Sequence, residues 1–533
     1  MKLTFNEYYN KVLGCYIGKN IGGTLGAPFE CYRGEYDVDW FVQDISEPIP
    51  NDDVDLQLVW LRAAEKEGKD IDSHLLAEYW NTYISATLAE YGSGKNNFNQ
   101  GIAPPLSGHL RNANRDSNGA WIRTEIWACL CAGNPALAVN YAYYDSSVDH
   151  SGEGVYSAVF CAAIQSAAFF VSDIYRLIDI GLSYIPENCA VVKAVNCVID
   201  CYKGGKTWKE ARKALFKATP SSFGMMCGYW KGTPDVPASD RCPVQQPDSE
   251  IPVAVHGFDA PWSIGAIVLA LLYGEGDFAK TVCLATNCGE DTDCTAGTAG
   301  AILGIIYGAS GIPEKWKNAC SNRIATWTLR IDQALRLPKT IEELAYRIAR
   351  QTPNFLGEYR CNILPGFSYK NGELAQEAQS FYEITPHPYL AYRPKMVDPA
   401  VQEDAKTLVS EQGRTIRRHF HLYNVLVSYD DSLVKITEGE TKKLELTFLN
   451  RLFTPQYLTV RILDLPETWT VKGGREFCVG LEHWHGSTNV NAYTLEFTPD
   501  CLTKGSYTIV LEISTNGRMT KNYVPVTFIN GSC

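Results

Sequence analysis

Three acidic residues lie within four positions of the stretch CGEDTDCTAG, residues 288–297. The carboxylates of Glu290, Asp291 and Asp293 would repel one another unless a cation or solvent separates their charges. Acids at the start of a helix also act as caps, where the helix dipole favours negative charge, but one acid is enough for that. The pattern fits a helix cap or a metal site, and three acids before an apolar helix exceed what capping needs.

A second acidic group lies in PNDD, residues 50–53. Asn51 is predicted as a helix N-cap, with Asp52 and Asp53 in the first turn, so capping again explains the pattern equally well. Two such groups are also what two divalent cations require, because hard cations take oxygen ligands and several carboxylates must offset their charge. A helix start repels cations, so a metal site there needs an excess of acids, which is present.

A third candidate is the glycine-rich stretch GCYIGKNIGGTLGAPFE, residues 14–30, which ends at Glu30. It lacks the strand–glycine–helix setting of a dinucleotide-binding fold, so that function is rejected. We expect a glycine-punctuated loop that carries the Glu30 carboxylate and lets it move over a site.

The elements that position these residues are predicted to be helical from residue 1 to about 345. Thr4 and Glu7 have capping-box spacing. Helical periodicity recurs further along the chain, in residues 121–133, 135–144, 155–171, 263–274 and 295–308. In the last of these, small residues recur every four positions at Ala296, Gly300, Gly304 and Gly308, so the backbone of a neighbouring helix can approach closely.

The rest of the chain has a different character. Residues 346–415 are rich in proline and tyrosine and are predicted to be an ordered connector. After residue 416 the apolar residues alternate with period two, and Asn516-Gly517 between two such runs is a strong hairpin signal. Residues 416–533 are therefore predicted to form an immunoglobulin-like β-sandwich, interpreted as a packing or interaction module.

Composition narrows the class of protein. The 533 residues are 45% hydrophobic and 20% charged, as in soluble globular proteins, and a net charge of −12 argues against nucleic acid or a membrane surface as partner. The apolar run at residues 157–171 is shorter than the about 20 residues that span a bilayer. With no export signal, the 18 cysteines are expected to be reduced in a cytoplasmic protein, and without CxxC pairs they do not indicate zinc.

Three motifs, taken in order, resemble the ADP-ribosylglycohydrolase family over residues 1–345: GKNIGGTLGAPFE, PNDD and LATNCGEDTDCTAGTAGAILGIIYG. The resemblance implies an all-α domain with two Mg²⁺ ions, or Mn²⁺, at its centre. It implies catalytic roles for Glu30, the family's mobile glutamate, and for Asp53. The metal-site residues that it implies are Asn51, Asp52, Asp53, Asp291, Asp293 and Cys294.

Two of these positions depart from the family's usual threonines. Asn51 still offers a carbonyl oxygen that can coordinate Mg²⁺. The Cys294 thiol is a soft ligand, poorly matched to Mg²⁺. One of the two metal ions is therefore expected to bind more weakly, to be replaced by another ion or to be absent. The identity of the sugar that the site accepts is left open.

The resemblance implies a divalent-metal-dependent hydrolase of a ribosyl glycosidic bond, in an ADP-ribosylated protein or a small ADP-ribose conjugate. One alternative is a hydrolase of a nucleoside or another glycoside, such as a furanoside, and another is a non-catalytic binding or structural relative. Retention of four ligand aspartates argues against the last. The sequence leaves open the exact substrate, the oligomeric state and the role of the sandwich.

Four weaker candidates are predicted to contact substrate, each with a plainer alternative. Arg123 could face a phosphate or form an ion pair, and His150 and Glu153 could bind substrate or cap a helix. Asp259 could line a pocket. His256 is interpreted as a polar residue with satisfied hydrogen bonds.

Overall fold

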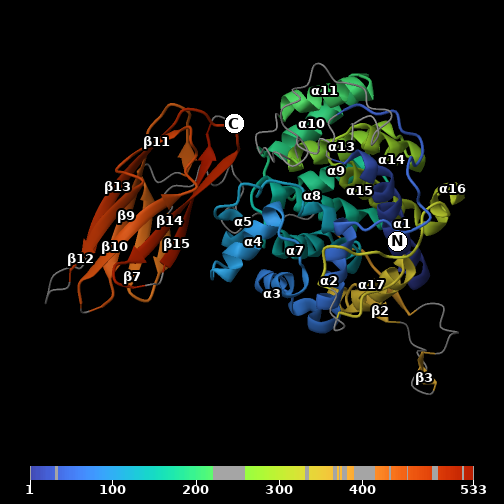
Figure 1. Cartoon of the computed structure of the whole chain (residues 1–533), viewed down its shortest axis with the longest axis horizontal. Helices are drawn as coiled ribbons and strands as arrows, with labels where there is room; N and C mark the ends of the chain where they lie inside the picture. Colours follow the sequence, from blue (N-terminus) through green and yellow to red (C-terminus); the bar gives the residue numbers. More distant parts are fainter. Residues whose placement is uncertain are drawn as a thin grey trace. The chain divides into compact units, whose positions relative to one another are not determined.

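The computed structural model describes most of the chain as two compact units, which Figure 1 shows coloured along the sequence. The first unit comprises residues 1–185 with 191–396, and the second comprises 186–190 with 397–533. The described residues are 2–30, 34–219, 258–330, 335–363, 369–370, 373–374, 381–388, 415–430, 434–452, 454–482, 490–518 and 521–531.

The first unit is built from helices, as predicted. Its α-helices are α1 (Phe5–Gly26), α2 (Asp52–Glu67), α3 (Ser73–Tyr83), α4 (Ala89–Asn99), α5 (Leu106–His109), α6 (Glu125–Leu130), α7 (Pro135–Ser146), α8 (Glu153–Ala168), α9 (Ile174–Leu182), α10 (Ala190–Lys203), α11 (Trp208–Ala218), α13 (Ala260–Tyr273), α14 (Phe278–Asn287), α15 (Thr292–Tyr307), α16 (Glu314–Lys317) and α17 (Ile341–Leu356). Among the described residues, no helix combines the length and apolar character needed to cross a bilayer.

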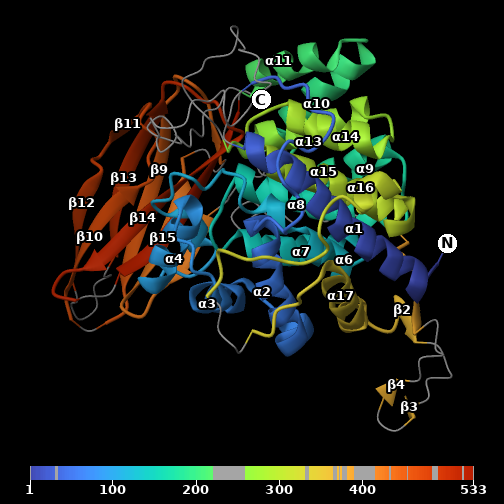
Figure 2. The same cartoon turned by 45° about the vertical axis from the view of Figure 1, so that its right-hand side comes forward.

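Helices α1 and α15 lie side by side and antiparallel at the centre of this unit (Figures 1 and 2). Small residues meet along the whole contact, in the pairs Gly14–Gly304, Gly18–Gly300, Gly22–Ala296 and Gly26–Thr292. At each of these glycines of α1, an added Cβ would lie less than 3.0 Å from the backbone of α15, a distance that real Cβ atoms essentially never show. The predicted stripe of small residues is thus confirmed as the surface where a neighbouring backbone approaches.

The expectation of a glycine-punctuated loop before Glu30 is wrong, because residues 5–26 form helix α1. Glycine lowers helix propensity by up to about 1 kcal/mol per residue, and this cost is what suggested a loop. Here the glycines recur every four residues and face α15, so close packing of two backbones offsets their poor propensity. Glu30 follows a short 3₁₀ turn, Ala27–Phe29, directly after this rigid helix.

Short strands accompany the helices. Strands β1 (Leu3–Thr4), β5 (Tyr382–Ile384) and β2 (Cys361–Ile363) form an antiparallel sheet in that order, and β3 (Tyr369–Lys370) pairs with β4 (Glu373–Leu374). Strands of two or three residues are too short to show a period-two pattern in the sequence. The predicted connector therefore includes the end of α17 and strands β2 to β5, while residues 389–414 lie outside the described part of the chain.

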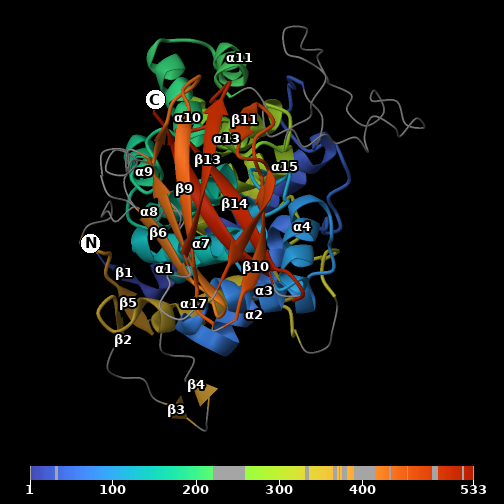
Figure 3. The same ribbon diagram turned by 90° about the vertical axis from the view of Figure 1, so that its left-hand side faces the viewer.

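The second unit is a β-sandwich, confirming the predicted fold class (Figure 3). One sheet has the order β12-β10-β14-β15-β8 and the other β11-β13-β9-β7-β6. The predicted hairpin is present, because the strands on either side of Gly517, which has a φ of 79°, pair antiparallel. The strands are β6 (Thr415–His419), β7 (Tyr423–Tyr429), β8 (Lys435–Ile436), β9 (Lys442–Asn450), β10 (Gln456–Leu463), β11 (Trp469–Lys472), β12 (Glu476–Leu481), β13 (Val490–Pro499), β14 (Ser506–Thr515) and β15 (Lys521–Asn530).

Candidate metal centre and active site

A strained turn presents the first acidic group at the start of α15. Gly289 and Glu290 both have left-handed backbone conformations, with φ of 76° and 66°, and this costs Glu290 on the order of 1 kcal/mol or more. Asp291 then occupies the N-cap position, but its side chain makes no capping hydrogen bond. Capping therefore does not account for the Asp291 carboxylate, and a role in an ion site is favoured.

The second acidic group begins α2 and faces the first. Asn51 is the N-cap, as predicted, and its Oδ1 accepts a 2.7 Å hydrogen bond from the backbone N–H of Asp53. The Asn51 amide nitrogen lies 3.5 Å from Oδ2 of Asp293, so a donor rather than an acceptor faces that carboxylate. Asp53 is buried, whereas the partly exposed Asp52 accepts a 3.1 Å hydrogen bond from the hydroxyl of Tyr91.

Two sets of side chains lie close enough to share an ion, each with its ligand atoms within 4.8 Å of one another. One set is Glu30, Asp291 and Asp293, and the other is Asp53, Asp293 and Cys294. Asp293 belongs to both sets. The fold thus brings together five of the predicted site residues from three segments that are far apart in the sequence.

The chemistry of the first set fits a divalent cation. Oδ1 of Asp291 and Oδ1 of Asp293 are buried and accept no hydrogen bond from the described residues. Burial, together with the neighbouring Asp53, raises the pKa of Asp293 to about 6, and burial with the charge of Asp293 raises the pKa of Asp291 well above its usual range. Buried carboxylate oxygens without partners are costly unless a cation neutralises them, and Mg²⁺ prefers oxygen ligands.

Comparison with known proteins identifies the fold that carries this site. The family model described as ADP-ribosylglycohydrolase matches residues 4–354, which is well over half of the chain. The chain belongs to the ADP-ribosylglycohydrolase family. A solved structure described as an ADP-ribosylglycohydrolase-related protein complex matches 65% of this chain and 99% of that chain, at 17% identity and a TM-score of 0.40. No curated protein matches the chain.

Membership of the ADP-ribosylglycohydrolase family confirms the resemblance inferred from the three motifs. It makes the chain a glycosyl hydrolase-type enzyme, with hydrolase activity of the ADP-ribosylglycohydrolase type.

We expect the metal-free ADP-ribosylglycohydrolase unit to lose stability as pH rises. The pKa of Asp293 is raised to about 6, and that of Asp52 to about 8 by burial and by Asp53 and Asp293, from an ordinary value of 3.8. A carboxyl with a raised folded-state pKa stabilises the fold fully below its unfolded pKa, and this contribution disappears as pH rises through the folded value. The melting temperature in EDTA should therefore fall between about pH 5 and about pH 8.

Mg²⁺ should restore the melting temperature more at about pH 8 than at about pH 5. In EDTA, an Asp293→Asn variant should show a smaller fall with pH than the unmodified protein, because one crowded carboxyl is gone. If the melting temperature of the variant falls as much with pH as that of the unmodified protein, or more, the acidic cluster is not the cause of the pH dependence.

Cys294, where the chain departs from its family, acts here as a hydrogen-bond donor. Its thiol donates to Oδ2 of Asp53 across 3.3 Å. Burial, reinforced by the charges of Asp291 and Asp293, raises the pKa of this thiol well above its usual range. A protonated thiol is a poor ligand for a hard cation. Metal ligation by Cys294 or by Asn51 stays a prediction.

In this structure Arg123 forms ion pairs with two aspartates, which was the alternative to a phosphate contact. The residue is fully buried, its Nε donates to Oδ1 of Asp145 at 2.9 Å, and its Nη2 donates to Oδ1 of Asp149 at 2.7 Å. Its guanidinium also lies 4.7 Å from the ring centroid of Trp80. These contacts connect the 3₁₀ turn Trp121–Arg123 to helices α3 and α7. A contact between Arg123 and a substrate phosphate stays a prediction, and the ion pairs of Arg123 do not support it.

The other weaker candidates are also buried. The ring nitrogens of His150 lie 2.8 Å from Oδ1 of Asp149 and 3.2 Å from Oγ of Ser117. Glu153 starts α8, and its Oε2 accepts a 3.1 Å hydrogen bond from the backbone N–H of Val191. Substrate contacts of these two residues stay predictions.

Asp259 is the N-cap residue of α13, without a side-chain capping hydrogen bond. Its backbone forms an isolated antiparallel bridge with Ser117, so it is held near the segment that leads to Asn118. A role of Asp259 in a substrate pocket stays a prediction, and His256 lies outside the described residues.

Sequence reasoning missed two groups that touch the cluster. Lys19 of α1 lies 2.6 Å from Oδ1 of Asp53, and Asn118 donates a 2.6 Å hydrogen bond to Oδ2 of Asp291. Burial opposes the charge of Lys19, but Asp53 and Glu125 outweigh it and raise the pKa of the ammonium group. The sequence carried one signal for Lys19: it is the only charged residue among the regularly spaced glycines of residues 14–26.

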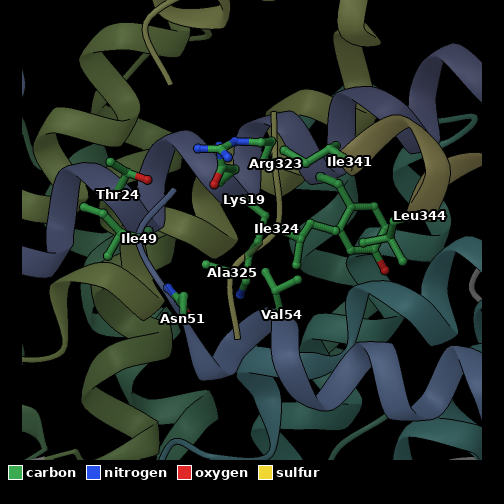
Figure 4. A pocket seen from close by; sticks show the side chains of 13 residues that line it. Lys19, Thr24, Ile49, Asn51, Val54, Arg323, Ile324, Ala325, Ile341 and Leu344 are labelled. Carbon is green, nitrogen blue, oxygen red and sulfur yellow. The ribbon is translucent and has the colours of Figure 1, made fainter. Parts of the chain in front are cut away.

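Lys19 and Asn51 also line one small cavity beside the cluster (Figure 4). Its volume is about 30 Å³, which is room for about one water molecule and too little for a sugar. The cavity is therefore not itself the place where substrate binds.

Replacement of Asn118 by alanine is expected to weaken divalent-cation binding by about 10–100-fold, because second-shell partners orient ligating carboxylates. The change frees Oδ2 of Asp291, which Asn118 now holds. Isothermal titration calorimetry with Mn²⁺ measures the effect. Ser263→Ala is the matched control, since it removes the other acceptor of the same amide nitrogen, 3.0 Å away, and leaves the bond to Asp291. Equal affinities in the two variants would contradict this role of Asn118.

Proposed function

We propose that the chain is a divalent-metal-dependent hydrolase that cleaves a ribosyl glycosidic bond in an ADP-ribosylated protein or a small ADP-ribose conjugate. The observation that carries this proposal is the buried cluster in which Asp291 and Asp293 each keep one oxygen without a hydrogen-bond partner in the described part of the chain. Unpaired buried charge is unfavourable for stability alone, so its presence in an enzyme of this family supports a functional ion site.

In this proposal, Glu30, Asp291 and Asp293 hold a divalent cation such as Mg²⁺ or Mn²⁺. When bound, such an ion supplies Lewis-acid chemistry, orienting sugar hydroxyls and making a water molecule a better nucleophile. The nearby carboxylates supply negative charge where the anomeric carbon becomes positive as the glycosidic bond breaks. Glu30 and Asp52 are the partly exposed acids, so substrate reaches the cluster from their side.

The catalytic assignments follow from exposure and pairing. Glu30 is partly exposed, after the 3₁₀ turn that follows α1, and is proposed to accept a proton from the attacking water. Asp53 is buried against Lys19 and is proposed to act by its charge rather than by proton transfer. These roles rest on the position of each carboxylate.

The test is release of ADP-ribose by the full chain from proteins modified through arginine, serine or cysteine, which cover N-, O- and S-linked substrates. We expect turnover of at least one linkage with Mg²⁺ or Mn²⁺ and loss of turnover in EDTA. A chain that binds the ion but cleaves none of the three linkages would refute the proposal.

A second candidate is favoured by Cys294, whose thiol stands where the family usually has a hydroxyl. A hydrolase of a nucleoside or a furanoside would turn over simple glycosides and leave ADP-ribose conjugates intact, which the same assay with a glycoside panel distinguishes. Calorimetry that detects no divalent-cation binding would instead support a non-catalytic relative.

A further inference from the structure

A buried lysine stands against the acidic cluster. Nζ of Lys19 lies 2.6 Å from Oδ1 of Asp53 and 3.3 Å from Oε1 of Glu125. It also donates to the carbonyl of Ile122 at 2.7 Å and to the hydroxyl of Thr298 at 3.2 Å. The Lys19, Asp53 and Glu125 side chains are at most 1% exposed. The ammonium group is thus surrounded by four oxygens, two of them from carboxylates, much as a bound metal ion would be.

Both carboxylate oxygens of Asp53 already face a neighbour. Oδ1 forms an ion pair with Nζ of Lys19 at 2.6 Å, and Oδ2 accepts the thiol proton of Cys294. A divalent cation on Asp53 would have to share this carboxylate with an ammonium group, and like charges at such short range repel strongly in a buried site. The ligand set of Asp53, Asp293 and Cys294 is therefore poorly suited to a second ion.

On the opposite side of the cluster, the described residues leave two buried carboxylate oxygens without a hydrogen-bond partner. Oδ1 of Asp291 and Oδ1 of Asp293 are buried and lack a hydrogen-bond donor there, and Glu30 completes the set within 4.8 Å. Among the described residues of the Glu30 ligand set, the buried carboxylate oxygens without a hydrogen-bond partner therefore belong to Asp291 and Asp293.

We infer that the Lys19 ammonium takes the place of one of the two cations, so that the site binds a single divalent cation at Glu30, Asp291 and Asp293. This inference rests on the metal site of the proposed function and replaces the expectation of two ions. Unlike a hydrated metal ion, an ammonium group carries no exchangeable water. Sugar hydroxyls and the attacking water would therefore all be organised by one ion.

The packing of α1 on α15 holds Lys19 in this position. Its aliphatic stem crosses α15 at Gly297, where an added Cβ would lie 3.3 Å from Cδ of Lys19. The adjacent Gly18 is in backbone contact with Gly300, which keeps the Lys19 backbone close to α15. The lysine therefore enters the cluster from between the two helices.

The test is a titration of the full chain with Mn²⁺, read by electron paramagnetic resonance and by native mass spectrometry. The unmodified protein is expected to bind one Mn²⁺ per chain, with the hyperfine pattern of an isolated ion. Lys19→Met keeps the length of the stem and removes the charge, and it is expected to bind a second Mn²⁺ whose spectrum is coupled to the first. Lys19→Arg keeps the charge and is expected to bind one.

The matched control is Lys11→Met, which removes a lysine of the same helix that donates to the backbone carbonyls of Ile305 and Ile306. It should keep one Mn²⁺ per chain. Two ions or none in the unmodified protein, or a single ion in folded Lys19→Met, would overturn the inference. If Lys19→Met does not fold, the ion count of the unmodified protein decides.

The same titration separates this inference from the proposed function, because ion counting needs no turnover. A chain that binds one Mn²⁺ and cleaves no ADP-ribose conjugate would refute the function and leave the single-ion site standing. A chain that binds two coupled ions and cleaves a conjugate would refute the single-ion site alone.

Discussion

Replacement of Asp293 by asparagine is expected to abolish divalent-cation binding and hydrolysis. Asp293 is shared by both candidate ligand sets, so its charge contributes whichever set holds the ion. We expect Mn²⁺ affinity to fall by more than the about 10–100-fold that a lost second-shell partner costs, with a comparable or larger fall in kcat/KM. Calorimetry and ADP-ribose release measure the two effects.

Glu290→Gln is the matched control for Asp293→Asn. It removes an acid from the same turn, but Glu290 belongs to neither ligand set. The control should keep both ion binding and turnover. In EDTA the Asp293→Asn protein should be at least as stable as the unmodified one, since a repelling charge is gone, so loss of function would not reflect unfolding. Ion binding retained in Asp293→Asn, or lost equally in both variants, would contradict the assignment.

Gly300→Ala is expected to destabilise the helical unit by at least about 3 kcal/mol, at the upper end of what overpacking usually costs. The new methyl group would lie less than 3.0 Å from the backbone carbonyl of Gly18, and a helix backbone cannot move aside as a side chain can. A change of this size lowers the melting temperature by roughly 6–12 °C in a domain of about 150–250 residues, and by less in this larger unit. Thermal unfolding followed by circular dichroism measures it.

Gly297→Ala provides the comparison, one turn earlier on the same helix. Its nearest contact would be Cδ of Lys19 at 3.3 Å, the middle of a side chain that can shift by a few tenths of an ångström. Alanine also gains up to about 1 kcal/mol over glycine in helix propensity, so this variant should be close to neutral. If both variants lose the same amount of stability, close backbone contact between α1 and α15 is not what makes Gly300 necessary.

Local signals in the sequence were sufficient wherever a few neighbouring residues decide the conformation. Thr4 and Glu7 form the predicted capping box, Asn51 caps α2, and Asn516-Gly517 lies between paired strands. Each of these features depends on hydrogen bonds or backbone angles within a few residues. The prediction of a loop from the glycine-rich stretch was wrong, because α1 is stabilised by contacts with a helix that is distant in the sequence, such as the contact between Gly18 and Gly300.

The sequence by itself determined the fold class, the family and the acids of the candidate site, because residue types, their spacing and their order suffice for these. Only the tertiary structure decided how the acids are paired. Lys19 reaches Asp53 because α1 and α15 pack backbone to backbone, and Cys294 donates its thiol proton to the same carboxylate. Which charges meet in a buried site depends on distances between distant segments, and such distances leave no local trace in the sequence.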